Sequence, residues 1–176
     1  MIATEGAETE PIYFQELHPG RDGNFRLKIL GNPNHKSRPA EVVNRLLAYE
    51  RQERHGPDTD YWAIIDRDAW RHDELCEAWA LMSGRSSYHL AMSNPCFELW
   101  LWLHLRPNRP FADRHDCQRS LMSEWPEFRK GDYDAGSLVS QVEIACSRAR
   151  EIDEAPDTAW PVGQATRVYQ LVEKLK

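Results

Sequence analysis

Short apolar segments separated by turn-forming residues predict four β-strands in the first part of the chain. Residues 61–65 (YWAII) are apolar throughout and stop at Asp66, which is typical of a central strand covered on both faces. Residues 25–30 (FRLKIL) alternate apolar and basic side chains with the period of a strand, and residues 88–92 form another short apolar segment. Residues 1–4 can form the end of a further strand.

The stretches around these strands have apolar residues spaced three or four positions apart, which predicts helices. Thr9 begins the first with Pro11 in its first turn, and Ser37 can cap another. Strands that alternate with helices imply right-handed crossovers and hence a parallel sheet. We therefore expect an α/β fold, with a four-stranded parallel sheet flanked by helices in residues 1–105 and a helical C-terminal extension, residues 106–176, packed on the same domain. The predicted helices span residues 9–17, 38–55, 73–82, 95–105, 135–150 and 164–175.

Composition and charge restrict the classes of function. The chain has 176 residues, of which 41% are hydrophobic and 28% charged, so a single domain with a substantial core fits better than a disordered chain. Lys and Arg number 22 and Asp and Glu 28, and the resulting net charge of −6 argues against a protein that holds nucleic acid by its overall charge. A bound metal cation would be needed to reverse the sign locally.

Cysteine and hydropathy patterns predict a cytoplasmic protein with no membrane partner. The four cysteines contain no C-x-x-C pair and are interpreted as reduced thiols. The chain opens with no signal peptide, and no apolar run approaches the roughly 20 residues that span a bilayer. The seven histidines have no metal-ligand spacing, and His104 is interpreted as a core residue.

Acidic residues follow several of the predicted strands. Glu5 and Glu10 come after the first, Asp66 and Asp68 after residues 61–65, and Glu98 after residues 88–92. Active sites of open parallel sheets form beyond the carboxyl ends of the strands, so these side chains could meet at one edge. Asp66 and Asp68 would point to the same side of an extended segment, and a divalent cation would relieve their repulsion. The pattern predicts an Mg²⁺ or Mn²⁺ site, because such ions take oxygen ligands beside phosphate substrates.

Each of these acids also has a structural alternative. An Asp-x-Asp pair can be a solvated loop or a helix cap, and Glu5 and Glu10 can be acids favoured by the dipole at a helix start. Glu98 can form a buried ion pair with an arginine, because its neighbours are apolar. For substrate phosphate the candidates are Lys36, in a basic loop before a helix start, and Arg67, between the two aspartates.

Three segments in this order resemble the RloB family, abortive-infection proteins of the AbiL type: 5–14 (EGAETEPIYF), 64–68 (IIDRD) and 93–104 (SNPCFELWLWLH). The resemblance implies a Toprim-like catalytic core, sharing the fold of topoisomerases and primases. It also implies a role in bacterial anti-phage defence with a partner AAA-type ATPase.

The resemblance also implies roles for individual residues. Glu5 matches the Glu that follows the first Toprim strand, and Asp66 and Asp68 match the D-x-D after the third. By similarity to Toprim nucleases of the overcoming-lysogenisation-defect group, Glu10 and Glu98 are further candidate ligands. Two departures are a first strand so short that upstream residues could be missing, and a poor match of PVGQATR (161–167) to the family's polar block.

The leading hypothesis is a Toprim-like nuclease whose catalytic, metal-binding residues are Glu5, Asp66 and Asp68. The substrate could be DNA or RNA, and a homo-oligomer is an open alternative. A non-catalytic adaptor or regulatory subunit of the ATPase is the main alternative function. A haloacid-dehalogenase-type phosphatase also uses D-x-D after a strand, but it needs a Thr or Ser soon after, where this chain has Ala69 and Trp70.

Overall fold

The computed structural model describes residues 1–17, 27–32, 36–53, 56, 58–67 and 70–175. Within these ranges a sheet of five strands has the order β2-β1-β3-β4-β5. The strands are β1 (Ile2–Thr4), β2 (Ile29–Leu30), β3 (Tyr61–Asp66), β4 (Tyr88–Asn94) and β5 (Ala165–Thr166). The first four are parallel and β5 is antiparallel to β4. The predicted α/β class is confirmed, but the sheet is five-stranded and mixed, not four-stranded and wholly parallel.

The additional strand lies in a segment predicted as the start of the last helix. Thr166 pairs with Ser93 and Ala165 with Asn94, and the Arg167 N–H donates to the Met92 carbonyl at 2.9 Å. A strand of two residues is too short to show an alternating pattern, so its pairing depends on the neighbouring strand β4 and not on a local signal.

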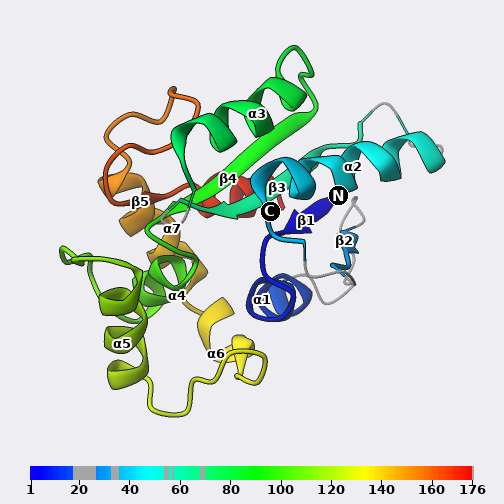
Figure 1. The fold of residues 1–176 in the computed structure, drawn as a ribbon. Helices are drawn as coiled ribbons and strands as arrows, with labels where there is room; N and C mark the ends of the chain where they lie inside the picture. The colour runs from blue at the N-terminus through cyan, green and yellow to red at the C-terminus, as the bar shows by residue number, and fades with distance from the viewer. Residues whose placement is uncertain (18–26, 33–35, 54–55, 57, 68–69, 176) are drawn as a thin grey trace.

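Helices cover both faces of the sheet, with α2 and α3 above it and α1 and α4 below it in Figure 1. The described helices are α1 (Thr9–Leu17), α2 (Pro39–Gln52), α3 (His72–Met82), α4 (Glu98–Leu105), α5 (Arg114–Glu124), α6 (Ala135–Val139), α7 (Val142–Ile152) and α8 (Val168–Lys174).

Three details of the predicted helices are wrong. Arg38, not Ser37, occupies the N-cap of α2, and no side chain caps that end. The helix predicted from residue 95 begins at Glu98, after a cis peptide bond between Asn94 and Pro95. The helix predicted over residues 135–150 is divided into α6 and α7, and the backbone leaves helical geometry at Gln141, with φ of −107° and ψ of 14°.

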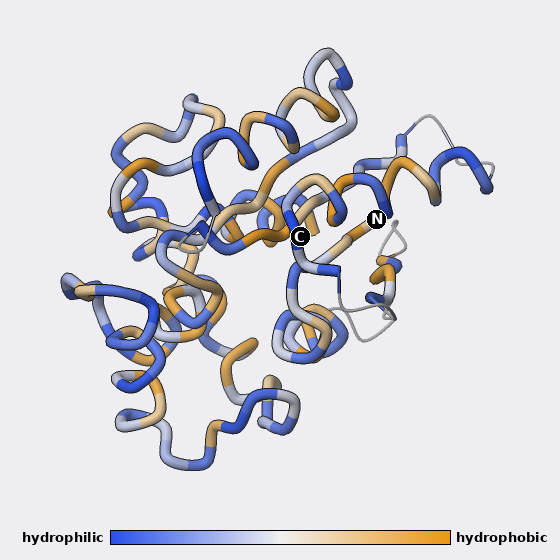
Figure 2. Tube along the Cα trace, in the orientation of Figure 1, coloured by the Kyte–Doolittle hydropathy of each residue, from blue (hydrophilic) through white to orange (hydrophobic). Residues whose placement is uncertain are grey.

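Strand β3 divides its side chains between two cores. Trp62 and Ile64 join the cluster formed with α1, α4, α7 and α8, whereas Ala63 and Ile65 pack with α2 and α3. Because successive residues of a strand face opposite sides, an uninterrupted apolar run is required here. The strands and the inner helix faces are accordingly hydrophobic, and the outer turns are hydrophilic (Figure 2).

The chain after residue 105 contributes to the lower of these cores. Leu121, Leu138 and Val168 belong to the same buried cluster as Ile2 and Trp100. Among the described helices, none combines the length and the apolar character that crossing a bilayer requires.

Candidate functional site

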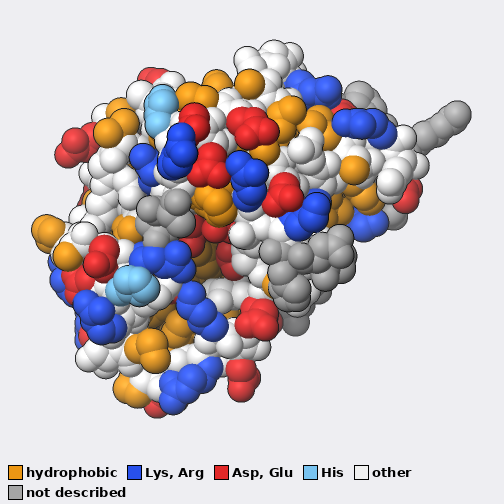
Figure 3. All heavy atoms as spheres, viewed as in Figure 1, with side chains coloured by type: hydrophobic (Ala, Val, Ile, Leu, Met, Phe, Trp, Pro, Cys, Tyr) orange, Lys and Arg blue, Asp and Glu red, His pale blue; other side chains and the backbone are white. Residues whose placement is uncertain are grey.

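A pocket of about 390 Å³ opens beyond the carboxyl ends of β1 and β3. Figure 3 shows a hollow near the centre of this face, with acidic side chains inside it and basic side chains around it. The described residues that line the pocket come from the β1–α1 turn and the first turn of α1, the β2–α2 connection, the end of β3, the start of α4, α5 and the turn before α6: Glu5, Gly6, Ala7, Glu8, Thr9, Glu10, Ser37, Asp66, Phe97, Glu98, Arg114 and Lys130.

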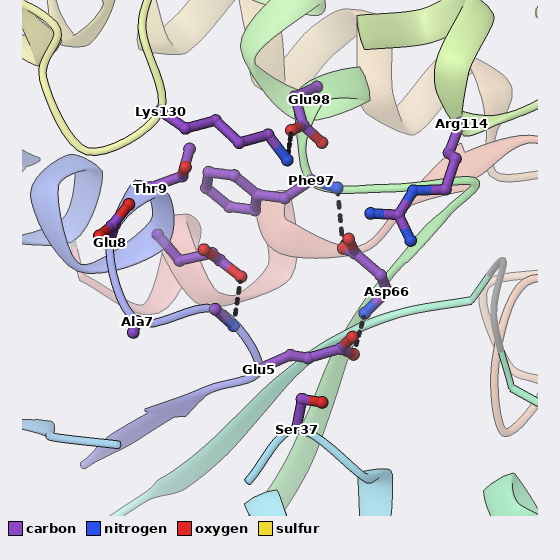
Figure 4. A pocket seen from close by; sticks show the side chains of 12 residues that line it. Glu5, Ala7, Glu8, Thr9, Ser37, Asp66, Phe97, Glu98, Arg114 and Lys130 are labelled. Carbon is purple, nitrogen blue, oxygen red and sulfur yellow. Dashed lines mark hydrogen bonds and ion pairs between the residues drawn. The ribbon is translucent and has the colours of Figure 1, made fainter. Parts of the chain in front are cut away.

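Glu5 lies directly after β1 and reaches across to the end of β3. Its backbone N–H donates to the Ile64 carbonyl at 2.9 Å, which fixes the residue beside the central strand. Its Oε2 accepts hydrogen bonds from the Asp66 backbone N–H at 3.1 Å and from the Trp70 indole at 3.0 Å. These two donors orient the carboxylate toward the pocket (Figure 4).

Asp66 is the last residue of β3, and its carboxylate faces the start of α4. The Phe97 backbone N–H donates to Asp66 Oδ1 at 2.8 Å. The predicted meeting of Glu5 and Asp66 at one edge of the sheet is therefore observed, with the side chain of one bonded to the backbone of the other.

Two residues from other elements hold the end of the short strand β1 in place. Arg45 on α2 donates from Nη1 to the Gly31 carbonyl at 3.2 Å and from Nη2 to the Thr4 carbonyl. The Asn32 side-chain amide donates to the Glu5 carbonyl at 3.2 Å. These contacts anchor the last carbonyls of β1, so the position of Glu5 depends on side chains of α2 and of the β2–α2 connection as well as on strand pairing.

Glu10 lies in the first turn of α1 and is buried, with only 5% of its surface exposed. Its Oε1 accepts a hydrogen bond from the Gly6 backbone N–H at 2.9 Å, which closes the β1–α1 turn. A Cβ at residue 6 would overlap the Glu10 carboxylate, so this approach requires glycine. Burial raises the pKa of Glu10, with a smaller upward contribution from the charge of Glu98, while backbone hydrogen bonds oppose the shift.

Glu98 begins α4 and forms a buried ion pair. Its Oε1 lies 2.6 Å from Lys130 Nζ and accepts a hydrogen bond from the Gln118 side-chain amide at 3.1 Å. Burial alone would raise the pKa of Glu98, but the charge and hydrogen bond of Lys130 outweigh it, and the pKa is lowered. The structural alternative considered for Glu98 is thus observed, with a lysine in place of the expected arginine.

Lys36 and Arg67, the candidate phosphate ligands, lie outside the described lining of the pocket that contains the acids. Among the described residues the pocket lining includes Ser37 but neither Lys36 nor Arg67. Lys36 Nζ is 3.4 Å from Glu41 and its side chain is mainly exposed, while Arg67 donates to the Trp70 carbonyl at 2.8 Å. Asp68 lies outside the described residues.

Sequence reasoning missed Arg114, Lys130 and Trp70, which all contribute to this site. Arg114 and Lys130 lie in polar segments after residue 105 where no hydrophobic period marks one side as inward. The closest signal is the Lys130–Gly131 pair, a turn-like dipeptide that gives no indication of which distant residues it contacts.

The oxygen-rich lining suits a hard divalent cation, which prefers carboxylate ligands. Within the described ranges no group of three or more His, Cys, Asp or Glu side chains is arranged to hold a metal ion. The Glu5 carboxylate accepts from the Asp66 backbone N–H, and Asp68 falls in the gap after Arg67. Of the five candidate ligands, the described chemistry therefore fits Glu5 and Asp66, while Glu10 is bonded to the Gly6 N–H and Glu98 to Lys130.

Comparison with known proteins identifies one family. The family model of RloB-like proteins matches residues 1–175. No curated protein and no solved structure matches the chain.

Proposed function

We propose that this chain, which belongs to the RloB-like family, is a cytoplasmic, metal-dependent nuclease with a Toprim-like active site. One observation carries the proposal: Glu5 and Asp66, 61 residues apart, meet at the carboxyl edge of the sheet through a hydrogen bond of 3.1 Å. Both stand where the Toprim-like resemblance requires acids. An acidic pocket of this kind suits hydrolysis of a phosphodiester by a metal-bound site better than binding of nucleic acid by charge alone.

The residues that would hold Mg²⁺ or Mn²⁺ are Glu5 and Asp66, with Asp68 as the proposed third ligand. Such an ion, when bound, supplies an activated water and stabilises charge on the phosphate. The chain itself contributes orientation: the Phe97 N–H fixes Asp66, and the Trp70 indole fixes Glu5. Glu10 acts through Gly6, whose N–H it accepts, to hold the turn that follows Glu5.

Exchanging Asp66 for asparagine tests the proposal with little change in shape. In Asp66→Asn the side-chain amide oxygen can still accept from the Phe97 N–H, so the substitution removes mainly the charge. We expect cleavage of labelled DNA or RNA in Mg²⁺ or Mn²⁺ to fall on the order of a thousandfold, the value of several kcal/mol of transition-state stabilisation.

The matched control is Asp60→Asn, just before the amino end of the same strand β3, where the carboxylate contacts His89 at 3.2 Å. This variant should cleave like the wild type. Equal activity of Asp66→Asn and Asp60→Asn would refute a catalytic role for Asp66.

We further propose, from the family resemblance, that cleavage serves abortive infection against phage and depends on a partner AAA-type ATPase. Cells that carry both proteins should restrict phage, and the same cells with Asp66→Asn should not. Restriction that persists with the inactive variant would separate the nuclease from the defence.

A non-catalytic adaptor of that ATPase is the second candidate. The observation in its favour is that Glu98 is engaged by Lys130 and Gln118, while the described residues assemble no three-ligand group. Calorimetric titration of the whole chain with Mn²⁺ distinguishes the two. Saturable binding that Asp66→Asn abolishes supports the nuclease, whereas absence of binding together with co-purification of the ATPase supports the adaptor.

A further inference from the structure

The pocket is lined by both acidic and basic side chains. Of the described residues that line it, five are acidic and two, Arg114 and Lys130, are basic. In Figure 4 Arg114 lies on the same side of the view as Asp66, and Lys130 reaches in from the opposite side to contact Glu98. A phosphodiester in this pocket would meet these two cations beside the carboxylates, and they would neutralise part of its charge.

We infer that Arg114 and Lys130 form the phosphate-binding subsite of this pocket, and that they recognise the sugar–phosphate backbone of nucleic acid whatever its bases. The inference rests on the proposed function, because it names the residues that hold the substrate beside Glu5 and Asp66. It also assigns a substrate role to the segment after residue 105, which supplies both cations.

Lys130 is held in a defined position at the pocket. Its Nζ contacts Glu98 at 2.6 Å, 52% of its side chain stays exposed, and the residue lines the pocket, so a second anion can approach it there. The turn that carries it is fixed against α1: Tyr133 donates to the Thr9 carbonyl at 2.7 Å, and Gly131 packs against Glu8. A lysine with three donors can serve Glu98 and a phosphate at the same time.

Arg114 reaches the same space from the first turn of α5. The Asp113 side chain caps this helix by accepting from the Asp116 N–H at 2.8 Å, which fixes where the helix starts. Arg114, Lys130 and Asp66 all line this one pocket, so a single ligand in it can meet all three. A planar guanidinium suits two phosphate oxygens, and the ammonium adds a point charge beside it.

The competing interpretation is that Lys130 only neutralises Glu98. A double variant separates the two roles, because Glu98→Gln with Lys130→Met removes one charge of each sign and keeps the local net charge. If Lys130 is only a counter-ion, this double variant should bind nucleic acid like its parent. If Lys130 contacts phosphate, the double variant should bind nucleic acid more weakly than its parent.

The experiment measures binding of a short fluorescein-labelled single-stranded oligonucleotide by anisotropy in EDTA. All proteins carry Asp66→Asn, so that no cleavage or metal is involved. We expect Arg114→Met and the double variant each to raise Kd about tenfold, the value of a charge-assisted hydrogen bond. The slope of log K against log salt should fall by about 0.7 for each lost contact.

Matched controls come from exposed residues of the same type. Arg119→Met on α5 and Lys174→Met on α8 should bind like the parent, because neither residue lines the described pocket. Arg114→Lys and Lys130→Arg keep the charge and should retain binding within a few-fold. They also test the subsite if either methionine variant fails to fold.

Two results would overturn the subsite: parental binding by either Arg114→Met or the double variant, or no oligonucleotide binding by the parent at low salt. Neither depends on cleavage. If the binding losses appear but the wild type cleaves nothing in Mg²⁺ or Mn²⁺, the phosphate subsite stands and the nuclease proposal fails. If cleavage depends on Asp66 but substitution of Arg114 and Lys130 leaves binding unchanged, the nuclease proposal stands and the phosphate subsite fails.

Discussion

Two ion pairs bury their acidic partner, but their surroundings differ. Asp153 and Arg167 are both enclosed, with side-chain exposures of 2% and 3%. Glu98 is equally enclosed at 3%, whereas its partner Lys130 is 52% exposed at the pocket. One pair is thus sealed in protein, and the other presents a cation to whatever enters the pocket.

The sealed pair is part of a saturated hydrogen-bond network. Arg167 donates to Asp153, to the carbonyls of Ala155 and Thr158, and to the Thr158 hydroxyl. The Tyr169 hydroxyl adds a donor to Asp153 at 3.1 Å. This network ties the chain after α7 to the start of α8. The donors of Arg167 and Tyr169 are bonded to protein acceptors, so this network stabilises the fold.

Under the proposed phosphate subsite, the difference separates a residue that stabilises the fold, Arg167, from one that binds a ligand, Lys130. Removing one partner of a closed pair leaves a charge that water cannot reach, whereas the partner of a pair beside a cavity can be rehydrated. The exposed side of a cation therefore distinguishes a binding residue from a structural one more clearly than the presence of an ion pair does.

The largest expected effect is on stability, from removal of each cation in turn. Arg167→Met should lower the free energy of unfolding by about 3–5 kcal/mol, because Asp153 stays buried without its counter-charge. Lys130→Met should cost only about 1 kcal/mol, since water from the pocket and Gln118 can still solvate Glu98. Guanidinium unfolding followed by circular dichroism gives both values. Equal losses would mean that Lys130 is as structural as Arg167.

Tyr13 and His104 form a buried, hydrogen-bonded pair that is uncharged at neutral pH, and its effect on stability should appear at acidic pH. The Trp100 carbonyl accepts from His104 Nδ1 at 2.9 Å, so His104 Nε2 accepts from the Tyr13 hydroxyl at 3.0 Å. Burial, with a smaller contribution from the charge of Arg148, lowers the pKa of His104 to about 4. The unfolded chain takes up this proton below about pH 6.5, but the folded one does so only near pH 4.

Stability should therefore fall as the pH decreases from about 6.5 to about 4, and His104 should account for about 3 kcal/mol of that loss. In His104→Gln this contribution disappears, so the stability gap to the wild type should narrow by that amount over the same range. His72→Gln, at an exposed position on α3, is the control for the loss of a histidine that is not buried. A constant gap across the range would exclude His104 as the titrating group.

The sequence was informative wherever a local pattern coincided with a tertiary requirement. The apolar run before Asp66 predicted a strand buried on both faces, and the position of Glu5 after a strand predicted its approach to Asp66. The partner of Glu98 was harder to predict from the sequence. The apolar helix predicts a buried counter-ion but not whether it is a lysine or an arginine.

Long-range contacts of polar segments could not be predicted in this way. Arg167 lies in the segment 161–167 that matched the family poorly, yet it is among the most extensively bonded side chains described. Strand β5 immediately precedes it and depends on β4 for its pairing. Lys130 and Arg114 join the pocket only because α5 and the following turn fold back across α4 and α1. None of these contacts leaves a periodic trace in the sequence.

The smallest expected effect is on oligonucleotide binding, from alanine at the turn that carries Lys130 compared with alanine at a turn remote from the pocket. Gly131 and Gly84 have the same left-handed backbone, with φ of 77° and 78°, so alanine at either should cost about 1 kcal/mol. Around Gly84 no described atom lies within 4 Å of an added Cβ, whereas at Gly131 it would come within 2.7 Å of the Glu8 carboxylate.

Gly131→Ala should consequently shift the turn away from α1 and weaken oligonucleotide binding a few-fold, while Gly84→Ala leaves binding unchanged. Both variants should unfold at similar denaturant concentrations, because each places alanine in the same left-handed backbone conformation. Since the two substitutions share their backbone strain, a difference in binding isolates the placement of Lys130 from the stability of the fold. Identical binding would mean that the turn does not set the position of the ammonium.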